Sequence, residues 1–297
     1  MEWTPGGDRS DVEDHRGDSG GGGGGGFSPM GFGGIHLGVG GTIILIVLSL
    51  IFKTNFLGMF AGGGGGGGST SAPISRSEQP ANAAGENREV DFVTFVLNDV
   101  QHTWETVLPQ QTNARYRHSK LVLFRDAFPS ACGKADEASG PFYCPGDEKV
   151  YLDLGFFNEL SQRFGAPGEF AQAYVIAHEL GHHVQKILGI EAQVRQAQER
   201  NRSQVNPLSV RLELQADCFA GIWAKTTEQR KIVNSSDVKA GLQAAAAVGD
   251  DRLQRMAGRQ VSPESFTHGS SAQRTHWFET GMQEGTVEAC NTFKSSQ

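Results

Sequence analysis

The chain has 297 residues, a formal net charge of −7 and a sequence isoelectric point near 5.7. Its lysines and arginines form no dense cluster, so the sequence lacks the basic surface that nucleic-acid binding requires, and no nucleic-acid partner is expected. Because roughly the first 85 residues contain little core-forming material, about 210 residues remain, which is enough for one globular domain with a sizeable core.

The amino-terminal region divides by composition into three segments. Residues 1–34 are acidic and then glycine-rich, and this composition predicts disorder because it cannot bury enough apolar surface. Residues 35–52 carry no formal charge apart from the titratable His36, and at about 1.5 Å per residue they are long enough for one transmembrane helix. A signal peptide or a buried core helix is the alternative. Residues 53–86 combine a glycine tract with Ser, Pro and Ala, which is typical of a flexible tether.

All four cysteines follow the apolar segment, and none belongs to a CxxC pair: Cys132, Cys144, Cys218 and Cys290. The first two would close a short loop, and the last two would tie the carboxyl-terminal segment to a helix. Charge does not decide the orientation of the apolar segment, since the lysines and arginines near it are only Arg16 on one side and Lys53 on the other. Disulfides would place residues 87–297 outside the cytoplasm, in the periplasm or at the cell surface, as part of a single-pass membrane protein. The alternative is four buried free thiols in a cytosolic domain.

Hydrophobic periodicity predicts an α+β domain at 87–297 in which helices dominate. The predicted helices span 90–108, 156–164, 168–188, 207–225, 236–256 and 272–285, and the predicted short strands span 120–124 and 149–154. The strand at 150–154 could bind an extended peptide along its edge, or it could be an ordinary core strand.

Residues 178–182 read His-Glu-Leu-Gly-His inside the predicted helix 168–188. His178 and His182 are four residues apart, so they lie on the same helix face about one turn apart and can reach one metal ion. Glu179 stands beside that ion but is poorly aimed to bind it, which suits a general base. His183 lies about 100° around the helix and is interpreted as a packing or surface residue.

A catalytic zinc ion normally takes three protein ligands and leaves its fourth position to water. The predicted helix 207–225 supplies two carboxylates four residues apart, Glu213 and Asp217, on a face that differs from its apolar stripe. We assign Glu213 as the third metal ligand. Asp217 is assigned as the hydrogen-bond partner of a ligand histidine, whose tautomer it would fix.

The pattern extends beyond these residues to four short segments: 140–145, 150–154, 213–220 and 267–271. With them the chain resembles the bacterial putative neutral zinc metallopeptidase family and, more distantly, the gluzincin peptidases, in which a downstream Glu follows HExxH. The resemblance covers roughly residues 89–293 and the apolar segment. It implies a zincin-like metallopeptidase domain, Zn2+ as the cofactor and a membrane anchor. The acidic, glycine-rich amino-terminal end departs from the shorter, more basic leader expected of this family.

The expected function is hydrolysis of peptide bonds in a peptide or protein substrate. Zinc held by His178, His182 and Glu213 would activate a water molecule, while Glu179 would take the water proton and pass it to the leaving amine. Two alternatives stay open: a non-catalytic module that keeps zinc for stability or for binding a partner, and a zinc hydrolase that acts on another amide or an ester.

Other polar residues have more than one interpretation. His268, in the turn 267–271, and Tyr143 could each donate a hydrogen bond to the tetrahedral intermediate, or each could stabilise a loop. The Asp-Asp-Arg sequence at 250–252 is interpreted as a solvated face or a salt bridge.

Overall fold

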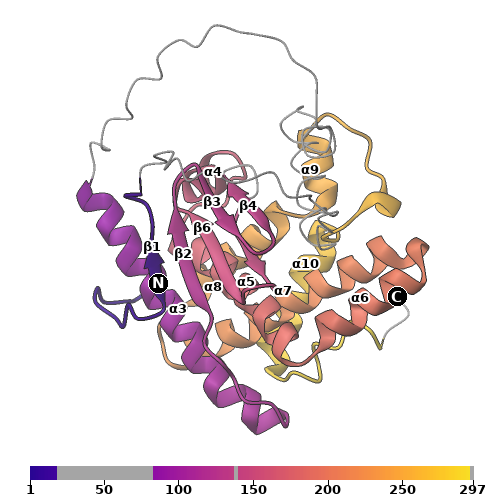
Figure 1. Cartoon of the computed structure of the whole chain (residues 1–297), viewed down its shortest axis with the longest axis horizontal. Coiled ribbons are helices and arrows are strands. Elements are labelled where there is room, and N and C mark those ends of the chain that lie inside the picture. The colour runs from indigo at the N-terminus through magenta and orange to yellow at the C-terminus, as the bar shows by residue number, and fades with distance from the viewer. Residues whose placement is uncertain (19–82, 137–139, 295–297) are drawn as a thin grey trace, which may run out of the picture.

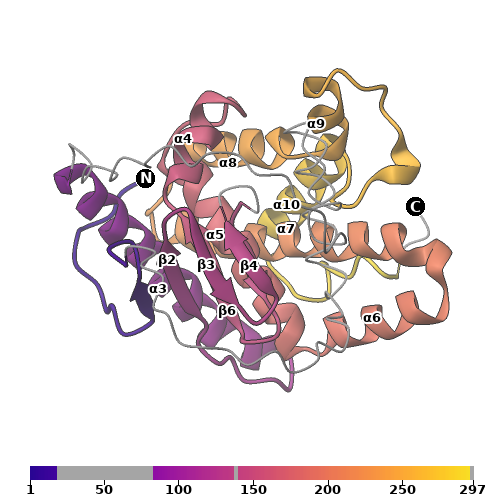
Figure 2. The same ribbon diagram turned by 45° about the horizontal axis from the view of Figure 1, so that its top comes forward.

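The computed structural model describes residues 1–18, 83–136 and 140–294 (Figure 1). The strands form one layer, and most helices pack on one side of it (Figures 1 and 2). The elements follow in this order: β1 (Val12–Asp14), α3 (Ala83–Gln111), β2 (Lys120–Phe124), β3 (Ala127–Ser130), β4 (Gly133–Asp136), β5 (Phe142–Cys144), β6 (Lys149–Asp153), α4 (Gly155–Gln162), α5 (Glu169–Ile187), α6 (Ile190–Arg200), α7 (Val205–Gln229), α8 (Ser235–Ala247), α9 (Asp250–Met256) and α10 (Ser271–Glu284), with 3-10 turns at Arg202–Gln204 and Pro263–Ser265. The predicted class, α+β with helices dominant, is confirmed.

The larger sheet has the strand order β1-β2-β6-β5. Strand β2 runs parallel to both β1 and β6, while β5 runs antiparallel to β6, with Tyr143 opposite Val150. Since β6 has a partner on each side, the prediction that 150–154 could bind a peptide along its edge is wrong, and the alternative of a core strand is confirmed. The strand at the edge next to α5 is β5, which among the described residues pairs with β6 alone.

One predicted helix is two helices in the structure. The span 236–256 divides into α8 and α9, and the break falls at Gly249, which is the N-cap of α9. A Cβ atom at Gly249 would lie 2.3 Å from the backbone nitrogen of Ser271, so a side chain has no room there. The close approach of Ser271, the first residue of α10, therefore interrupts a segment whose hydrophobic pattern favours one continuous helix.

Helices α5 and α7 cross at very short range, and this crossing places the functional residues. The fourth residue of the motif, Gly181, faces Ala216, and a Cβ atom at Gly181 would lie 3.0 Å from the Ala216 carbonyl oxygen. A larger residue would push the two helices apart. The glycine inside the motif thus favours this close packing, and Leu180 on α5 and Phe219 on α7 are fully buried.

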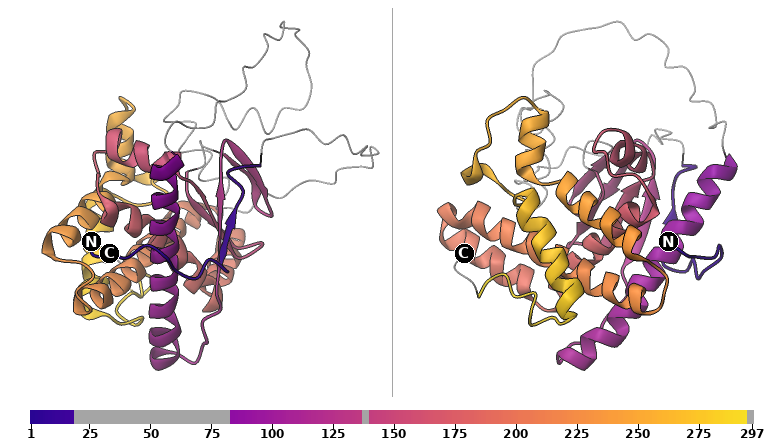
Figure 3. Two further views of the ribbon diagram at one scale, coloured as in Figure 1. Left: turned by 90° about the vertical axis from the view of Figure 1, so that its left-hand side faces the viewer. Right: turned by 180° about the vertical axis from the view of Figure 1, so that it is seen from behind.

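The amino-terminal residues 1–18 are folded against the domain, so the prediction of disorder for 1–34 is wrong for this part. Strand β1 pairs in parallel with β2, and the Trp3 ring packs edge-on against Phe92 with centroids 5.2 Å apart. Figure 3 shows this segment running beside α3 at the edge of the sheet. The prediction failed because a strand of three residues is too short to show an alternating hydrophobic pattern, and the composition of 1–34 is dominated by glycine.

The remaining predictions for the amino-terminal region lie outside the described residues, apart from the end of the tether. Residues 19–34, the apolar segment 35–52 and most of the tether 53–86 are not described, whereas α3 already begins at Ala83. Among the helices of the described ranges, none has the length and apolar character needed to cross a membrane.

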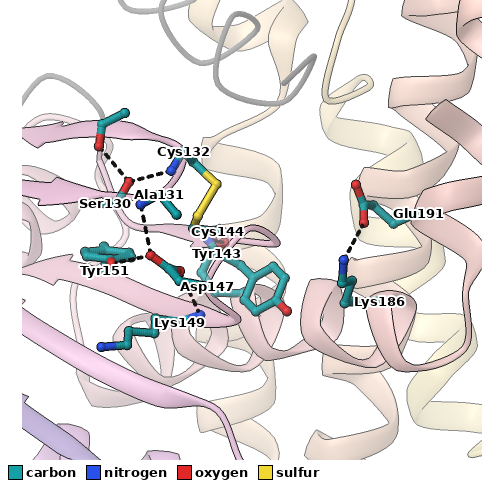
Figure 4. Close-up of a disulfide and its surroundings, with 12 residues drawn as sticks. Ser130, Ala131, Cys132, Tyr143, Cys144, Asp147, Lys149, Tyr151, Lys186 and Glu191 are labelled. Atoms are coloured by element: carbon teal, nitrogen blue, oxygen red, sulfur yellow. Dashed lines mark hydrogen bonds and ion pairs between the residues drawn. A yellow bond between two sulfur atoms is a disulfide. The ribbon is translucent and has the colours of Figure 1, made fainter. Parts of the chain in front are cut away.

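Both predicted disulfides are present. Cys132 is bonded to Cys144 with a Cα–Cα distance of 5.7 Å, and Cys218 to Cys290 with 5.5 Å. The first joins the β3–β4 hairpin to the edge strand β5 (Figure 4). The second joins α7 to the carboxyl-terminal segment, and no cysteine in the described part of the chain is free.

The attachment of β1 is expected to weaken as the pH rises. His118 lies between two carboxylates, with Nδ1 2.5 Å from Asp11 Oδ2 and Nε2 2.8 Å from Glu105 Oε1. Burial alone would lower the pKa of His118, but these hydrogen bonds raise it above its ordinary 6.5. A raised folded pKa gives stabilisation that is complete below the unfolded pKa and is lost as the pH passes the folded pKa. Lys120 stays paired with Asp11 throughout, so the loss is partial.

Amide hydrogen exchange of 12–14, corrected for the intrinsic effect of pH, measures this attachment. We expect protection factors to fall across the His118 titration in the native protein and to be independent of pH in His118→Gln. Equal protection factors above and below that titration in the native protein would contradict the assignment.

Candidate metal centre

Helix α5 brings the two motif histidines together. The rings of His178 and His182 lie one turn apart with centroids 4.9 Å from each other. The helix contacts α3, α7, α8 and β5, so it is buried on nearly all sides rather than along one stripe. His178 is 6% exposed and Glu179 is 9% exposed. The motif therefore lies inside the domain and not on a surface helix.

Glu213 on α7 lies against both imidazoles. Its Oε2 is 3.2 Å from His178 Nε2, and its Oε1 is 3.6 Å from His182 Nε2. These three residues offer ligand atoms that all lie within 4.8 Å of one another. Four-coordinate zinc with bonds of about 2.1 Å has ligand atoms about 3.4 Å apart, and the two separations between Glu213 and the histidines, 3.2 and 3.6 Å, are close to this value.

The charge of the centre also suits a divalent cation. Burial alone would raise the pKa of Glu213, but the neighbouring histidines His268 and His182 hold it well below its ordinary range, so the residue is a carboxylate. Burial alone would lower the pKa of His178, yet the Asp217 and Glu213 carboxylates raise it to about 10. The same negative charges that hold a proton on His178 would stabilise a metal ion in its place.

Asp217 is hydrogen-bonded to the ring of His178 on the side away from Glu213. Its Oδ1 is 2.9 Å from His178 Nδ1 and accepts a hydrogen bond of 2.5 Å from the Tyr174 hydroxyl. Arg274 on α10 donates from Nε to Oδ2 and from Nη2 to Oδ1, both at 2.8 Å. Asp217 is fully buried and Arg274 is 3% exposed. The imidazole thus presents Nε2 to the centre, and the carboxylate behind it is neutralised by the guanidinium.

Glu179 lies next to His178 on α5 and is not among the three residues whose atoms could hold a metal ion together. Its Oε2 accepts a hydrogen bond of 2.8 Å from the backbone N–H of Tyr143 in the edge strand β5. Burial raises the pKa of the Glu179 carboxyl. The next histidine, His183, is bonded to the Tyr143 hydroxyl (2.9 Å) and donates to the Arg117 carbonyl (2.7 Å), so it packs helix against strand as expected.

Of the two interpretations of the 250–252 sequence, the solvated face is wrong for Asp250, whereas salt bridges are present: Asp251 pairs with Arg255 at 2.5 Å, and Asp250 Oδ1 lies 3.4 Å from His268 Nδ1. Asp250 is 4% exposed, and its Oδ2 accepts hydrogen bonds from three consecutive backbone N–H groups, those of Thr267, His268 and Gly269, at 2.7, 2.6 and 3.0 Å. The carboxylate therefore builds the turn that holds His268 near Glu213. An Asp that begins a helix can bind backbone N–H groups of a distant loop, and nothing in the local sequence distinguishes this from a surface role.

Sequence reasoning missed three residues of this centre: Tyr174, Gln185 and Arg274. Tyr174 lies four residues before His178 on the same helix face, so its position could have been noticed from helical spacing. Gln185 lies three residues after His182, and its amide oxygen is 2.9 Å from His182 Nδ1. Arg274 comes from the last helix, and only the packing of α10 on α7 brings it to Asp217.

Replacing Arg274 with Met is expected to destabilise the domain by about 3–5 kcal/mol, because a buried carboxylate would lose its cation. Zinc affinity is expected to fall about 10–100-fold, since the support of a ligand histidine is disturbed. Denaturant unfolding of the metal-free protein and zinc titration measure the two effects. The double variant Asp217→Asn/Arg274→Met is the control, and it should recover part of the lost stability. A double variant less stable than the single one would contradict the ion-pair explanation.

Known proteins are similar to this chain over all or most of its length. A family described as "Putative neutral zinc metallopeptidase" matches residues 1–293. "Uncharacterized protein YpfJ" of Escherichia coli K12 is 40% identical over 300 residues, which is 100% of both chains. "Uncharacterized protein Rv2575" of Mycobacterium tuberculosis H37Rv is 39% identical over 237 residues, 76% of this chain and 78% of that protein. No solved structure matches the chain.

Proposed function

The chain belongs to the neutral zinc metallopeptidase family, and from this premise we propose that it hydrolyses peptide bonds with zinc held by His178, His182 and Glu213. The observation that carries the proposal is the meeting of these three side chains from α5 and α7, with Glu179 beside them. Family membership supports Zn2+ as the cofactor.

The residues of the centre divide the chemistry among them. When bound, zinc would supply an electrophilic centre that makes water more acidic and polarises a carbonyl. Glu179 takes the proton of the attacking water and passes it to the leaving nitrogen. Its Oε2 is engaged by the Tyr143 N–H, which leaves Oε1 for the proton. Because the pKa of Glu179 is raised, it lies closer to neutral pH. A base with such a pKa can both accept a proton and release it.

A peptide is the substrate that the surroundings favour over other amides or esters. Strand β5 is the edge of the sheet, and its Tyr143 N–H points toward Glu179 rather than toward β6. An extended peptide can pair with such an edge through main-chain hydrogen bonds, and this would bring a peptide bond next to the base. Competition between an unstructured protein and a small non-peptide amide tests the preference, and faster hydrolysis of the small amide would contradict it.

His268 is the better candidate for stabilising the tetrahedral intermediate. The hydroxyl of the other candidate, Tyr143, is engaged with the buried His183. His268 lies near Glu213, is held by Asp250, and has a pKa that its carboxylate neighbours raise although burial alone would lower it. A protonated imidazole donates hydrogen bonds from both nitrogens. We expect His268→Phe to lower kcat with little change in KM, and an unchanged kcat would contradict this role.

The direct experiment is metal analysis of the full chain together with cleavage of an unstructured protein such as casein. We expect one zinc per chain, and cleavage that stops with a chelator and returns with added zinc. Stoichiometric zinc without cleavage of any peptide would favour the binding-module alternative. Absence of stoichiometric zinc would overturn the proposal.

The two disulfides support a localisation of the domain outside the cytoplasm. We do not extend this proposal to a single membrane crossing by 35–52. Strand β1 precedes that segment, β2 follows it, and the two strands are hydrogen-bonded neighbours. One crossing would separate them, so we propose that both lie on the same side of any membrane. One-sided labelling of single cysteines introduced before and after the segment tests this; labelling of only one of the two would contradict it.

A further inference from the structure

We infer that the carboxyl-terminal segment, residues 286–294, positions the ligand histidine His182 through two buried glutamines, Gln185 on α5 and Gln215 on α7. The inference deepens the proposed function and rests on it, because it concerns the same metal centre. No charged residue takes part in this support. It differs in that respect from the support of His178, which comes from the Asp217 carboxylate.

A continuous chain of hydrogen bonds leads from the segment to the imidazole. Gln215 Nε2 donates to the Cys290 carbonyl at 3.0 Å, and Gln185 Nε2 donates to Gln215 Oε1 at 3.1 Å and to the Leu212 carbonyl at 2.7 Å. The last member is Gln185 Oε1, which is 2.9 Å from His182 Nδ1. Gln185 and Gln215 are 1% and 3% exposed, so water does not compete for these bonds.

The direction of the chain is fixed at its backbone ends. A carbonyl oxygen only accepts hydrogen bonds, so the amide NH2 groups of Gln215 and Gln185 must face Cys290 and Leu212. Gln185 is then left with its oxygen toward His182, and Nδ1 of that ring must be the donor. The proton is thereby placed on Nδ1, and the lone pair of Nε2 faces Glu213. This is the tautomer that a metal ligand requires.

The carboxyl-terminal segment is tied to α7 so that its carbonyl group keeps its position. The Cys218–Cys290 disulfide joins it to α7 at the residue whose carbonyl begins the chain. Thr292 donates from its hydroxyl to the Arg211 carbonyl at 2.7 Å, a second attachment to the same helix. The His182 side chain is 20% exposed, whereas that of His178 is 8% exposed. The surrounding core therefore restrains His182 less, and its orientation depends more on this hydrogen bond.

The test is a double-mutant cycle on zinc affinity in the full chain, measured by competition with a chromophoric chelator. Gln185→Leu removes the acceptor of His182 and should raise the zinc dissociation constant about 10–100-fold. Gln215→Leu keeps the contact between Gln185 and His182 but removes the hydrogen bond that Gln215 Oε1 accepts from the Gln185 amide. It should raise the zinc dissociation constant about threefold to tenfold. The double variant should be no weaker than Gln185→Leu, because Gln215 acts only through Gln185.

The matched control is Gln198→Leu. Gln198 is also buried, on α6, and donates to the Val205 carbonyl and the Ser209 hydroxyl, both at 3.0 Å, outside the chain. It should lower stability toward denaturant without changing zinc affinity. If Gln215→Leu does not fold, Gln215→Met, with a side chain of the same length, takes its place.

Each outcome separates the inference from the proposed function. Native zinc affinity in the Gln215 variant, or effects that add fully in the double variant, would overturn the inference alone. A reduced affinity in Gln198→Leu equal to that in Gln215→Leu would also overturn it, since any buried glutamine would then act alike. A native chain that fails to bind zinc would overturn the proposed function together with it.

Discussion

Glu179→Gln is expected to lower the rate of peptide hydrolysis about 10²–10⁴-fold, which is the range that a positioned acid or base contributes. Glutamine has the size of glutamate, and its amide oxygen can still accept the 2.8 Å hydrogen bond from the Tyr143 N–H. Its amide nitrogen cannot take up a proton. Because Glu179 is outside the set of ligand atoms, zinc content should stay at the native level. Turnover of an unstructured protein and metal analysis of the same preparation measure the two quantities.

The matched control for this variant is Glu169→Gln on the same helix. Glu169 lies in the first turn of α5, where its side chain is 33% exposed and paired with Arg88 at 3.1 Å. An exposed ion pair of this kind contributes little to stability, so activity and zinc content should both match those of the native protein. A Glu179→Gln protein that still cleaves peptides at the native rate would exclude Glu179 as the base. Loss of zinc in that variant would instead mean that Glu179 is part of the metal site.

The sequence predicted those parts of the centre that depend on one helix at a time. The spacings 178 to 182 and 213 to 217 place each pair on one helix face, and the structure has both pairs on continuous helices. The meeting of the two helices needed one further assumption, that a zinc ion requires a third ligand. Gly181 then makes the close crossing possible, although the motif pattern treats that position as variable.

The missed residues depend on long-range packing rather than on spacing. Arg274 reaches Asp217 only because α10 packs on α7, and Asp250 reaches its turn from the start of another helix. Strand β1 is a related case, since its three residues acquire their structure from β2, more than a hundred positions away. Sequence periodicity reports on a single element, whereas these contacts are properties of the whole fold.

Glu213→Gln is expected to remove stoichiometric zinc and, with it, peptide hydrolysis. An amide oxygen carries no charge and is a poor zinc ligand beside two imidazoles, which favour a carboxylate as their third partner. The affinity should therefore fall by more than the about 10–100-fold that loss of an outer hydrogen-bond partner costs. Zinc titration of the metal-free variant, with circular dichroism as a check of folding, gives this value.

The matched control for Glu213→Gln is Asp217→Asn on the same helix. Asp217 touches His178 Nδ1 and not the side of the ring that faces the centre, so its loss should weaken zinc binding without abolishing it. Arg274 would lose its counter-charge in this variant, so stability should fall further than in Glu213→Gln. The two carboxylates, four residues apart, should thus separate into one that governs metal content and one that governs stability. Zinc retained at native affinity in Glu213→Gln would mean that the third ligand is another group, and the proposed centre would fail.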